Sequence, residues 1–311
     1  MGNISMFGIG VTISCFVLYS LFSYLAIEYG NLKMTNYGAK TTGEAVNTIA
    51  IDIDVMQILL FTALISSNDL VATISIVSYE AQPKLFSCIF GEGVFNDAVS
   101  IILFNTMKNL QGSKFYWYSP LIIMVEFLLL GVISISVGLV FGISLSLLFK
   151  HVRFLTVSPI IETFLVFIFC YASYFVSYMI KIPGSTLEMS GIIAIITCGI
   201  VSAHYTYYNI SFNAKKGTTF AFSLVGEASE AAIYAYVGLA LYSTIPTWWS
   251  WSFILVQFII VVGGRVVAIL LVFYSFRLCF KSKTINLKEL LFISYAGMIR
   301  GAVAFALVLQ I

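Results

Sequence analysis

The chain has 311 residues, of which 60% are hydrophobic and only 10% are charged. With a mean hydropathy of +1.00, it is excluded from the ordinary soluble domains and is predicted to be an all-α protein that crosses a membrane several times. The formal net charge of +2 is too small, and the Lys and Arg residues are too scattered, to indicate a nucleic-acid partner.

About nine apolar runs follow one another along the chain, each near the length of about 20 residues that a spanning helix needs. The first extends from Met6 to Ile27, and the polar stretch after it, residues 28–54, is expected to be the longest loop. The second run, Val55 to Tyr79, is interrupted by the polar group Ser66 to Asp69. Because each half alone would be too short to cross a bilayer, we predict a discontinuous helix whose break lines a cavity.

The third run, Leu85 to Phe104, carries two carboxylates and a neighbouring amide, those of Glu92, Asp97 and Asn96. A carboxylate inside a membrane must be paired, protonated or exposed to a wet cavity, so its default interpretation is a functional site. We therefore predict that this helix handles ions.

The remaining runs are apolar, with few charged residues, and the sixth of the nine is short. They are Leu121 to Phe149, Ile160 to Ile180, Met189 to Ala203, Phe220 to Tyr242, Trp251 to Phe276, and a ninth that begins near Leu287. The ninth contains Gly297, Arg300 and Gly301. Two interrupted runs in corresponding positions point to a transporter site, although a glycine pair can equally serve close helix packing. Glu162, near the start of the fifth run, is expected to face lipid headgroups.

Lys and Arg set the orientation of membrane proteins, because they concentrate in cytoplasmic loops. The loops after the second, fourth, sixth and eighth runs hold more of them than the loops between. We therefore predict that these loops, and the N-terminus of the chain, lie in the cytoplasm.

Asp97 is the strongest candidate for the ion-binding carboxylate. Burial penalises the charged form of a carboxylate, so an Asp in a partly dry cavity can exchange a proton for a cation near the working pH. Asn96 offers a neutral oxygen to a hard cation, and Asp69, with Ser66, Ser67 and Asn68, would add side-chain and backbone oxygens. The alternatives are a fixed ion pair for Asp97 and an interhelical hydrogen bond for Asn96.

Glu92 and Arg265 are predicted to pair, because an Arg in a helix interior needs an anion. Such a pair would hold the ion-handling helix in place and leave Asp97 available. Glu230 and Arg300 are the next intramembrane charges, and the sequence leaves their partners open.

The chain contains no phosphate-binding loop, zinc-protease motif, esterase motif or dinucleotide fingerprint. We therefore expect a transporter rather than an enzyme, with no cofactor and no metal beyond a transported cation. The five cysteines lie without close spacing and predict neither a metal site nor a disulfide framework.

Several motifs resemble those of the eukaryotic sodium/proton exchangers, the monovalent cation:proton antiporter family. The clearest is FGEGVFNDAVSIILF at Phe90 to Phe104, and ISSNDLVA at Ile65 to Ala72 resembles the helix break of the family. The others follow in family order: SGIIAIITCGIVSAHYT at Ser190 to Thr206, GEASEAAIYAYVGLAL at Gly226 to Leu241, GGRVVAI at Gly263 to Ile269 and YAGMIRGAVAFAL at Tyr295 to Leu307. The sequences CGIVSAHYT and GMIRGAV are most similar to those of the organellar and vacuolar branch of the family.

The resemblance implies an antiporter-like fold with discontinuous crossing helices, built as two inverted repeats. It implies that Asp97 binds Na⁺ or K⁺ and H⁺ in turn, that Asn96 marks one-for-one electroneutral exchange, that Asp69 flanks the site, and that Glu92 and Arg265 form a structural pair. It further implies alternating access, a homodimer in a lipid bilayer, and a role in pH and cation regulation. The sequence leaves open whether the membrane is organellar, vacuolar or plasma.

Leu70 stands where the family usually has proline. By the same resemblance, the chain is expected to be one exchanger domain, residues 1–311, that lacks opening helices, a last helix and a cytoplasmic tail. The alternatives are a non-transporting membrane fragment that acts as an assembly partner and an ion channel.

Overall fold

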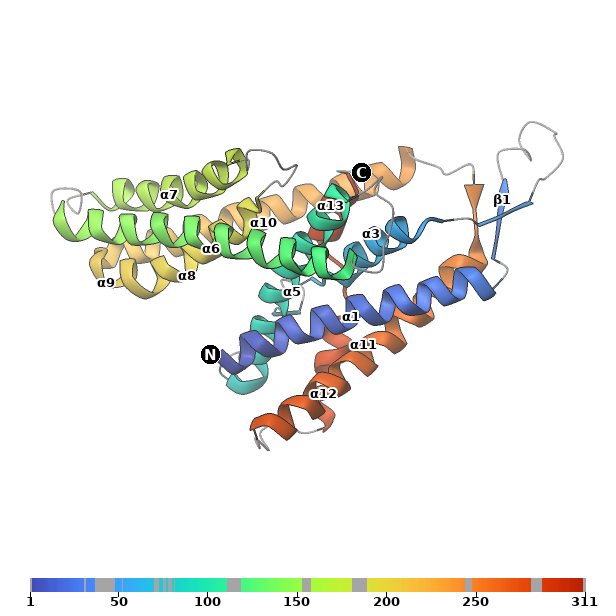
Figure 1. The fold of residues 1–311 in the computed structure, drawn as a ribbon. Helices are drawn as coiled ribbons and strands as arrows, with labels where there is room; N and C mark the ends of the chain where they lie inside the picture. Colours follow the sequence, from blue (N-terminus) through green and yellow to red (C-terminus); the bar gives the residue numbers. More distant parts are fainter. Residues whose placement is uncertain are drawn as a thin grey trace. The chain divides into compact units, whose positions relative to one another are not determined.

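The computed structural model describes residues 2–30, 32–36, 48–51, 53–69, 73–74, 77, 80, 82–110, 119–152, 158–180, 189–243, 248–280 and 287–309. These residues form long helices and three short strands (Figure 1). The helices are α1 (Gly2–Tyr29), α3 (Val55–Ser66), α5 (Pro83–Asn109), α6 (Ser119–His151), α7 (Pro159–Met179), α8 (Gly191–Val201), the π-helical turn Ser202–Thr206, α9 (Tyr207–Asn209), α10 (Phe212–Ser243), α11 (Trp251–Phe280), α12 (Leu287–Ala296) and α13 (Ala302–Val308). The fold is thus the all-α membrane class that the sequence predicts.

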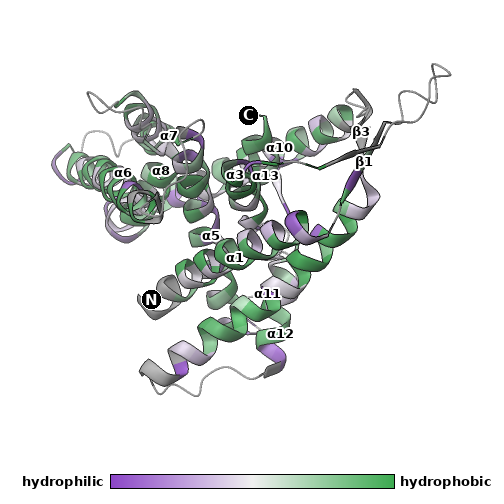
Figure 2. Ribbon diagram, turned by 45° about the vertical axis from the view of Figure 1, so that its right-hand side comes forward, coloured by the Kyte–Doolittle hydropathy of each residue, from purple (hydrophilic) through white to green (hydrophobic). Residues whose placement is uncertain are grey.

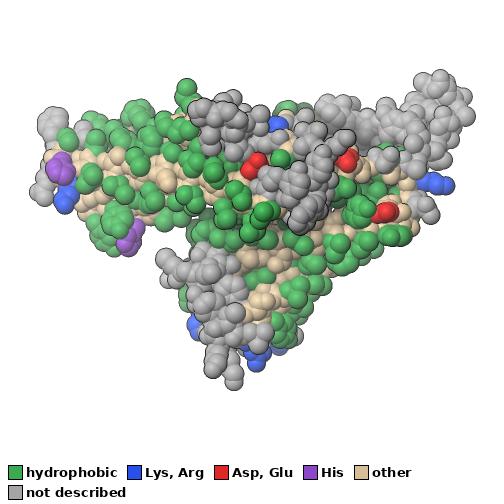
Figure 3. Space-filling model, in the orientation of Figure 1, with side chains coloured by type: hydrophobic (Ala, Val, Ile, Leu, Met, Phe, Trp, Pro, Cys, Tyr) green, Lys and Arg blue, Asp and Glu red, His purple; other side chains and the backbone are tan. Residues whose placement is uncertain are grey.

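Among the residues that the structure describes, six helical segments are long and apolar enough to cross a membrane. They are Phe7–Tyr29, Pro83–Lys108, Ile123–His151, Pro159–Met179, Gly191–Asn209 and Trp251–Ser275. The hydropathy colouring of the ribbon in Figure 2 is mostly hydrophobic along these helices, and Figure 3 shows hydrophobic side chains over much of the visible described surface. The predicted count of about nine spans is not confirmed among the described residues: two runs are broken into short helices, and α10 is not among the six segments.

Both predicted breaks are present. Helix α3 ends at Ser66, and Ser67 continues as extended backbone with φ −68° and ψ 150°. Helix α12 ends at Ala296, and α13 begins only at Ala302. The ninth run is therefore a discontinuous helix. In the second run α3 ends at the predicted break, and most of the residues that would continue it, Leu70 and the predicted end at Tyr79 among them, lie outside the described residues.

The polar stretch at residues 28–54 contains structure that the sequence did not predict. Strand β1 (Lys33–Asn36) pairs antiparallel with β2 (Thr48–Ala50) on one side and with β3 (Trp248–Trp249) on the other. The strands are two to four residues long, so they leave little periodic signal, and the pairing of β1 with β3 joins segments far apart in the chain.

The contacts divide the chain into two compact units. The first unit comprises Met1–Phe115 and Val237–Ile311, and the second comprises Tyr116–Tyr236. In the first unit, α1 packs against α3, α5 and α11. Its core combines buried side chains of α1, α5, α11 and α12, among them Val11, Tyr19, Ile89, Ile269 and Ile293. Every candidate ion-binding residue belongs to this unit.

In the second unit, α6, α7 and α8 pack on one another around Leu145, Phe149, Val166, Cys170 and Cys198. The approach of α6 to α8 depends on glycine. A Cβ added at Gly138 would meet the Ala194 carbonyl and would lie 2.7 Å from Thr197 Cβ. This close packing of small residues is typical of helices in membranes.

Gly138→Ala is expected to lower stability by about 1–3 kcal/mol, since backbone and packed side chains must move apart. Gly199→Ala is the matched control, because a Cβ there meets no atom within 4 Å in the part of the chain that the structure describes. That change is expected to raise stability by about 0.5–1 kcal/mol, because alanine is the better helix former. Thermal unfolding of the two purified variants in one detergent measures the difference, and equal shifts would contradict the predicted contact.

The expectation that Glu162 faces lipid headgroups is wrong. Its side chain is fully buried, and Oε2 accepts hydrogen bonds from the Ser211 backbone N–H (3.0 Å) and hydroxyl (2.8 Å). Ser211 Oγ in turn accepts from the Ala214 N–H (3.3 Å), which caps the first turn of α10. Helix α10 therefore begins at Phe212, earlier than the predicted start at Phe220.

Candidate functional site

The two helix breaks meet in the first unit. The Asp69 N–H donates to the Ile299 carbonyl at 2.8 Å, and the Thr73 hydroxyl donates to the carbonyls of Asp69 (2.7 Å) and Ala296 (3.3 Å). A Cβ at Gly301 would lie 2.7 Å from Asp69 Cγ, so glycine permits this approach. The unwound segments thus satisfy one another's backbone groups, which a membrane requires.

Arg300 contacts the end of α3. Its Nη1 donates to the carbonyl of Ser67, one of the carbonyls that a helix C-terminus leaves without an intrahelical partner. A cation there also suits the negative end of the helix dipole. The sequence left the partner of Arg300 open, and the structure identifies it as the backbone of the break. Glu230, the other open charge, lies half-buried on α10 in the second unit.

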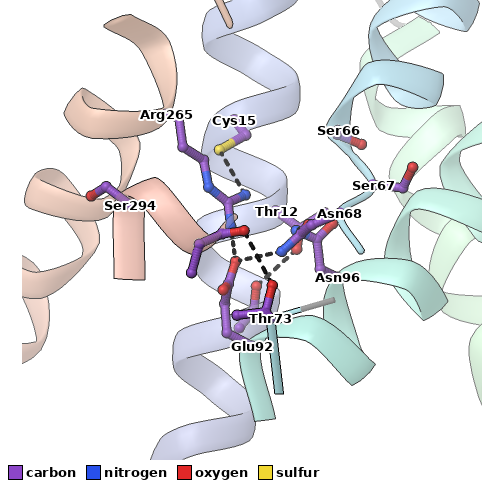
Figure 4. A network of polar contacts seen from close by, with 12 residues as sticks. Thr12, Cys15, Ser66, Ser67, Asn68, Thr73, Glu92, Asn96, Arg265 and Ser294 are labelled. Carbon is purple, nitrogen blue, oxygen red and sulfur yellow. Dashed lines mark hydrogen bonds and ion pairs between the residues drawn. The ribbon is translucent and has the colours of Figure 1, made fainter. Parts of the chain in front are cut away.

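Glu92 and Arg265 form the predicted ion pair between α5 and α11, with Arg265 Nη2 donating to Glu92 Oε1 (Figure 4). Both side chains are buried, at 2% and 0% exposure. Arg265 Nη1 also lies 3.7 Å from the Cys15 sulfur, and the absence of a side chain at Gly297 leaves room for the guanidinium. Each charge is thereby neutralised in an environment where either alone would be costly.

A chain of polar side chains connects the ion pair to the first break. Asn68 Nδ2 donates to Glu92 Oε1 at 3.2 Å, and the Asn68 and Asn96 amides are hydrogen-bonded to each other. Ser100 contacts the Asn96 amide at 3.2 Å, and its hydroxyl is 2.8 Å from that of Ser66. Both amides predicted as cation ligands therefore already have protein partners, and they would have to exchange these partners to bind an ion.

Asp97 lies beside Asn96 on α5 but takes no part in that series of hydrogen-bonded side chains. Its Oδ1 is buried and accepts no hydrogen bond from the described residues. The backbone of Asn68 interacts with the carboxylate, and the charged groups that act on it are those of Asp69, Glu92 and Arg300. Asp97 is thus a half-buried carboxylate next to the crossing breaks, with an oxygen available to a small cation or a proton.

Sequence reasoning missed two hydroxyls of this site, those of Ser100 and Thr73. Ser100 lies four residues after Asn96, so it occupies the same face of α5, and this spacing is a signal that could have identified it. Thr73 contacts the Ala296 carbonyl, and Ser66, which was predicted to supply an oxygen at the break, pairs with Ser100. Their partners could not be predicted without the fold.

Comparisons with known proteins identify the family. The whole chain, residues 1–311, matches the profile of a family described as sodium/hydrogen exchanger, transmembrane. It is 29% identical over 297 residues to an uncharacterized Na(+)/H(+) antiporter of Schizosaccharomyces pombe, covering 94% of this chain and 47% of the relative. It is 30% identical over 288 residues to sodium/hydrogen exchanger 3 of Oryctolagus cuniculus, covering 88% and 33%.

A third relative, the endosomal/prevacuolar sodium/hydrogen exchanger of Saccharomyces cerevisiae, is 32% identical over 197 residues, covering 63% of this chain and 30% of the relative. The chain spans about half or less of the length of these curated relatives. The match to the family profile over the entire sequence shows that the chain belongs to the sodium/hydrogen exchanger family.

Proposed function

We propose that the protein is an electroneutral antiporter that exchanges Na⁺ or K⁺ for H⁺ at Asp97 by alternating access. The observation that carries this proposal is the contrast between two carboxylates on α5. Glu92 is paired with Arg265, whereas Asp97 has a buried oxygen that accepts no hydrogen bond within the described residues. Only the second is chemically ready to hold a proton and a cation in turn.

Asp69 and the unwound backbone complete the proposed site. Asp69 lies close enough to Asp97 to act on it electrostatically, and two nearby carboxylates attract a monovalent cation more strongly than one. Ser67 and Asn68 belong to the extended segment where α3 is interrupted, and carbonyls of such segments are suitable ligands for Na⁺. The cation is the substrate of this site and not a resident metal.

Electroneutrality follows if Asp97 alone releases its proton when the cation binds. The bound cation then carries the same single positive charge as the proton that it replaces. Each time the site changes from one side of the membrane to the other, Asp97 holds either H⁺ or the metal ion. Asn96 adds an oxygen and no charge, and Glu92 stays neutralised by Arg265, so neither changes the proton count. The same chemistry would accommodate Na⁺ or K⁺, because both bind to oxygen ligands.

To test this, the full-length protein is reconstituted in liposomes that contain a pH-sensitive dye, and the external cation concentration is raised suddenly. A jump of external Na⁺ or K⁺ is expected to alkalinise the lumen, with no net current on a solid-supported membrane. Current without obligatory proton movement would indicate a channel. No flux with either cation would favour the non-transporting assembly partner. The rates for the two cations determine the selectivity.

The domain organisation, oligomeric state, orientation and membrane of the transporter are part of the same proposal. We expect residues 1–311 to belong to one exchanger domain in a homodimer, with the N-terminus of this chain in the cytoplasm. The likeness to an endosomal/prevacuolar exchanger favours an organellar membrane, where exchange would regulate luminal pH and cation content. Cysteine accessibility from the two sides of sealed vesicles tests the orientation, and crosslinking in the membrane tests the dimer.

A further inference from the structure

The second unit contains an open cavity of about 600 Å³ that the proposed exchange does not use. It is lined by aromatic, cationic and hydroxyl side chains, namely Tyr207, Phe212, Lys215, Lys216, Thr219, Phe220 and Ser223. The cavity is shallow and largely open to the surface, so it could hold one polar part of a ligand rather than enclose a whole molecule.

The two lysines are held at the cavity by aromatic rings. Lys215 Nζ lies 4.2 Å from the centroid of the Tyr207 ring, and Lys216 Nζ lies 4.7 Å from that of Phe212. Contacts of this kind restrict long side chains before any ligand arrives, so two ammonium groups are presented together. Thr219 already donates its hydroxyl to the Lys215 carbonyl, which leaves the lysines as the principal donors to a ligand.

The charge of the lining fits an anion. The lining residues include two cations and no carboxylate. The carboxylate of Glu162 contacts Ser211, directly before Phe212, but its side chain is fully buried and does not line the cavity. A ligand with a phosphate or carboxylate group would therefore meet positive charge without a competing acid from the lining.

The location of the cavity favours a lipid over a soluble anion. Tyr207 belongs to the last turn of the membrane-spanning segment Gly191–Asn209, so the cavity lies where that segment leaves the bilayer. Tyr207 is exposed, as expected of a tyrosine at the membrane interface, and Phe212 and Phe220 are exposed on α10. The excess of Lys and Arg in alternate loops predicts that this end faces the cytoplasm, whose leaflet carries the anionic lipids.

We propose that this cavity binds the headgroup of an anionic glycerophospholipid, with Lys215 and Lys216 contacting the phosphate and the rings of Phe212 and Phe220 contacting the lipid at its glycerol and upper chain region. The site is separate from Asp97, and its test is a binding measurement that does not depend on transport.

The test titrates the full-length protein, in a neutral detergent at low salt, with dioctanoyl phosphatidylserine, and follows binding by microscale thermophoresis. The double variant Lys215→Gln, Lys216→Gln is expected to bind about thirtyfold more weakly, since each lysine near an anionic lipid surface strengthens binding by a factor of about five to six. The variant Lys215→Arg, Lys216→Arg should retain affinity, which separates lost charge from a folding defect. Dioctanoyl phosphatidylcholine should show no saturable binding.

The matched control is Lys84→Gln, Lys150→Gln. It removes the same charge from two exposed lysines predicted to lie on the same side of the membrane, and it should leave the affinity unchanged. If it weakens binding as much as the cavity variant, the lipid is held by general surface charge and the proposal is wrong. Competition by inorganic phosphate at concentrations similar to the lipid would also overturn it, because the site would then take a soluble anion.

Discussion

Asp97→Asn is expected to reduce cation-driven proton flux to the level of protein-free liposomes. An amide can offer an oxygen to a cation, but it cannot take up and release the proton that the proposed exchange requires. Because Asp97 Oδ1 accepts no hydrogen bond in the described part of the chain, the loss cannot be ascribed to a broken structural bond at that atom. Initial rates of dye response after a Na⁺ or K⁺ jump, at equal amounts of reconstituted protein, measure the effect.

The same variant is expected to melt at an unchanged or higher temperature, since a neutral amide is cheaper to bury than a carboxylate. Asp54→Asn is the matched control, because Asp54 is exposed just before α3 in the same unit, and this change should preserve both flux and stability. Retention of cation-coupled flux by Asp97→Asn would refute the assignment. A large fall in melting temperature would instead show that Asp97 holds the fold together.

The backbone of this site could be predicted because membranes restrict the possible structures. A polar group such as Ser66 to Asp69 inside an apolar run must be either a loop or a break, and the length of the halves excludes two spans. The same reasoning applies to the interruption before α13, although there the alternative of close packing remained open. The pairing of Glu92 with Arg265 followed from the cost of an isolated charge in a helix interior.

The side-chain partners were less predictable, because they depend on how distant segments approach. Arg300 could have partnered an acid, yet it donates to the Ser67 carbonyl, a group that every residue has and no sequence pattern marks. Asn68 was predicted as a cation ligand, but its amide connects Glu92 with Asn96. Glu162 was misplaced because its partner, the start of α10, is remote in sequence.

Removing either member of the Glu92 and Arg265 pair is expected to destabilise the protein by about 3–5 kcal/mol, because the remaining charge is left buried without its partner. The two single variants should differ. Arg265→Met leaves Glu92, which can become neutral by taking a proton, whereas Glu92→Gln leaves Arg265, which stays charged. Glu92→Gln is therefore expected to melt at the lower temperature, and only Arg265→Met should gain stability as the pH falls.

Thermal unfolding in detergent at pH 5.5 and pH 8 measures both effects, with Glu227→Gln as the control, because Glu227 is exposed on α10 and its loss should change stability by less than about 0.5 kcal/mol. The double variant Glu92→Gln, Arg265→Met should recover much of the lost stability, since no buried charge remains, and should still exchange cations for protons. If Glu92→Gln instead melts normally and abolishes exchange, the roles of Glu92 and Asp97 are reversed, and the carboxylate paired with Arg265 is the one that transports.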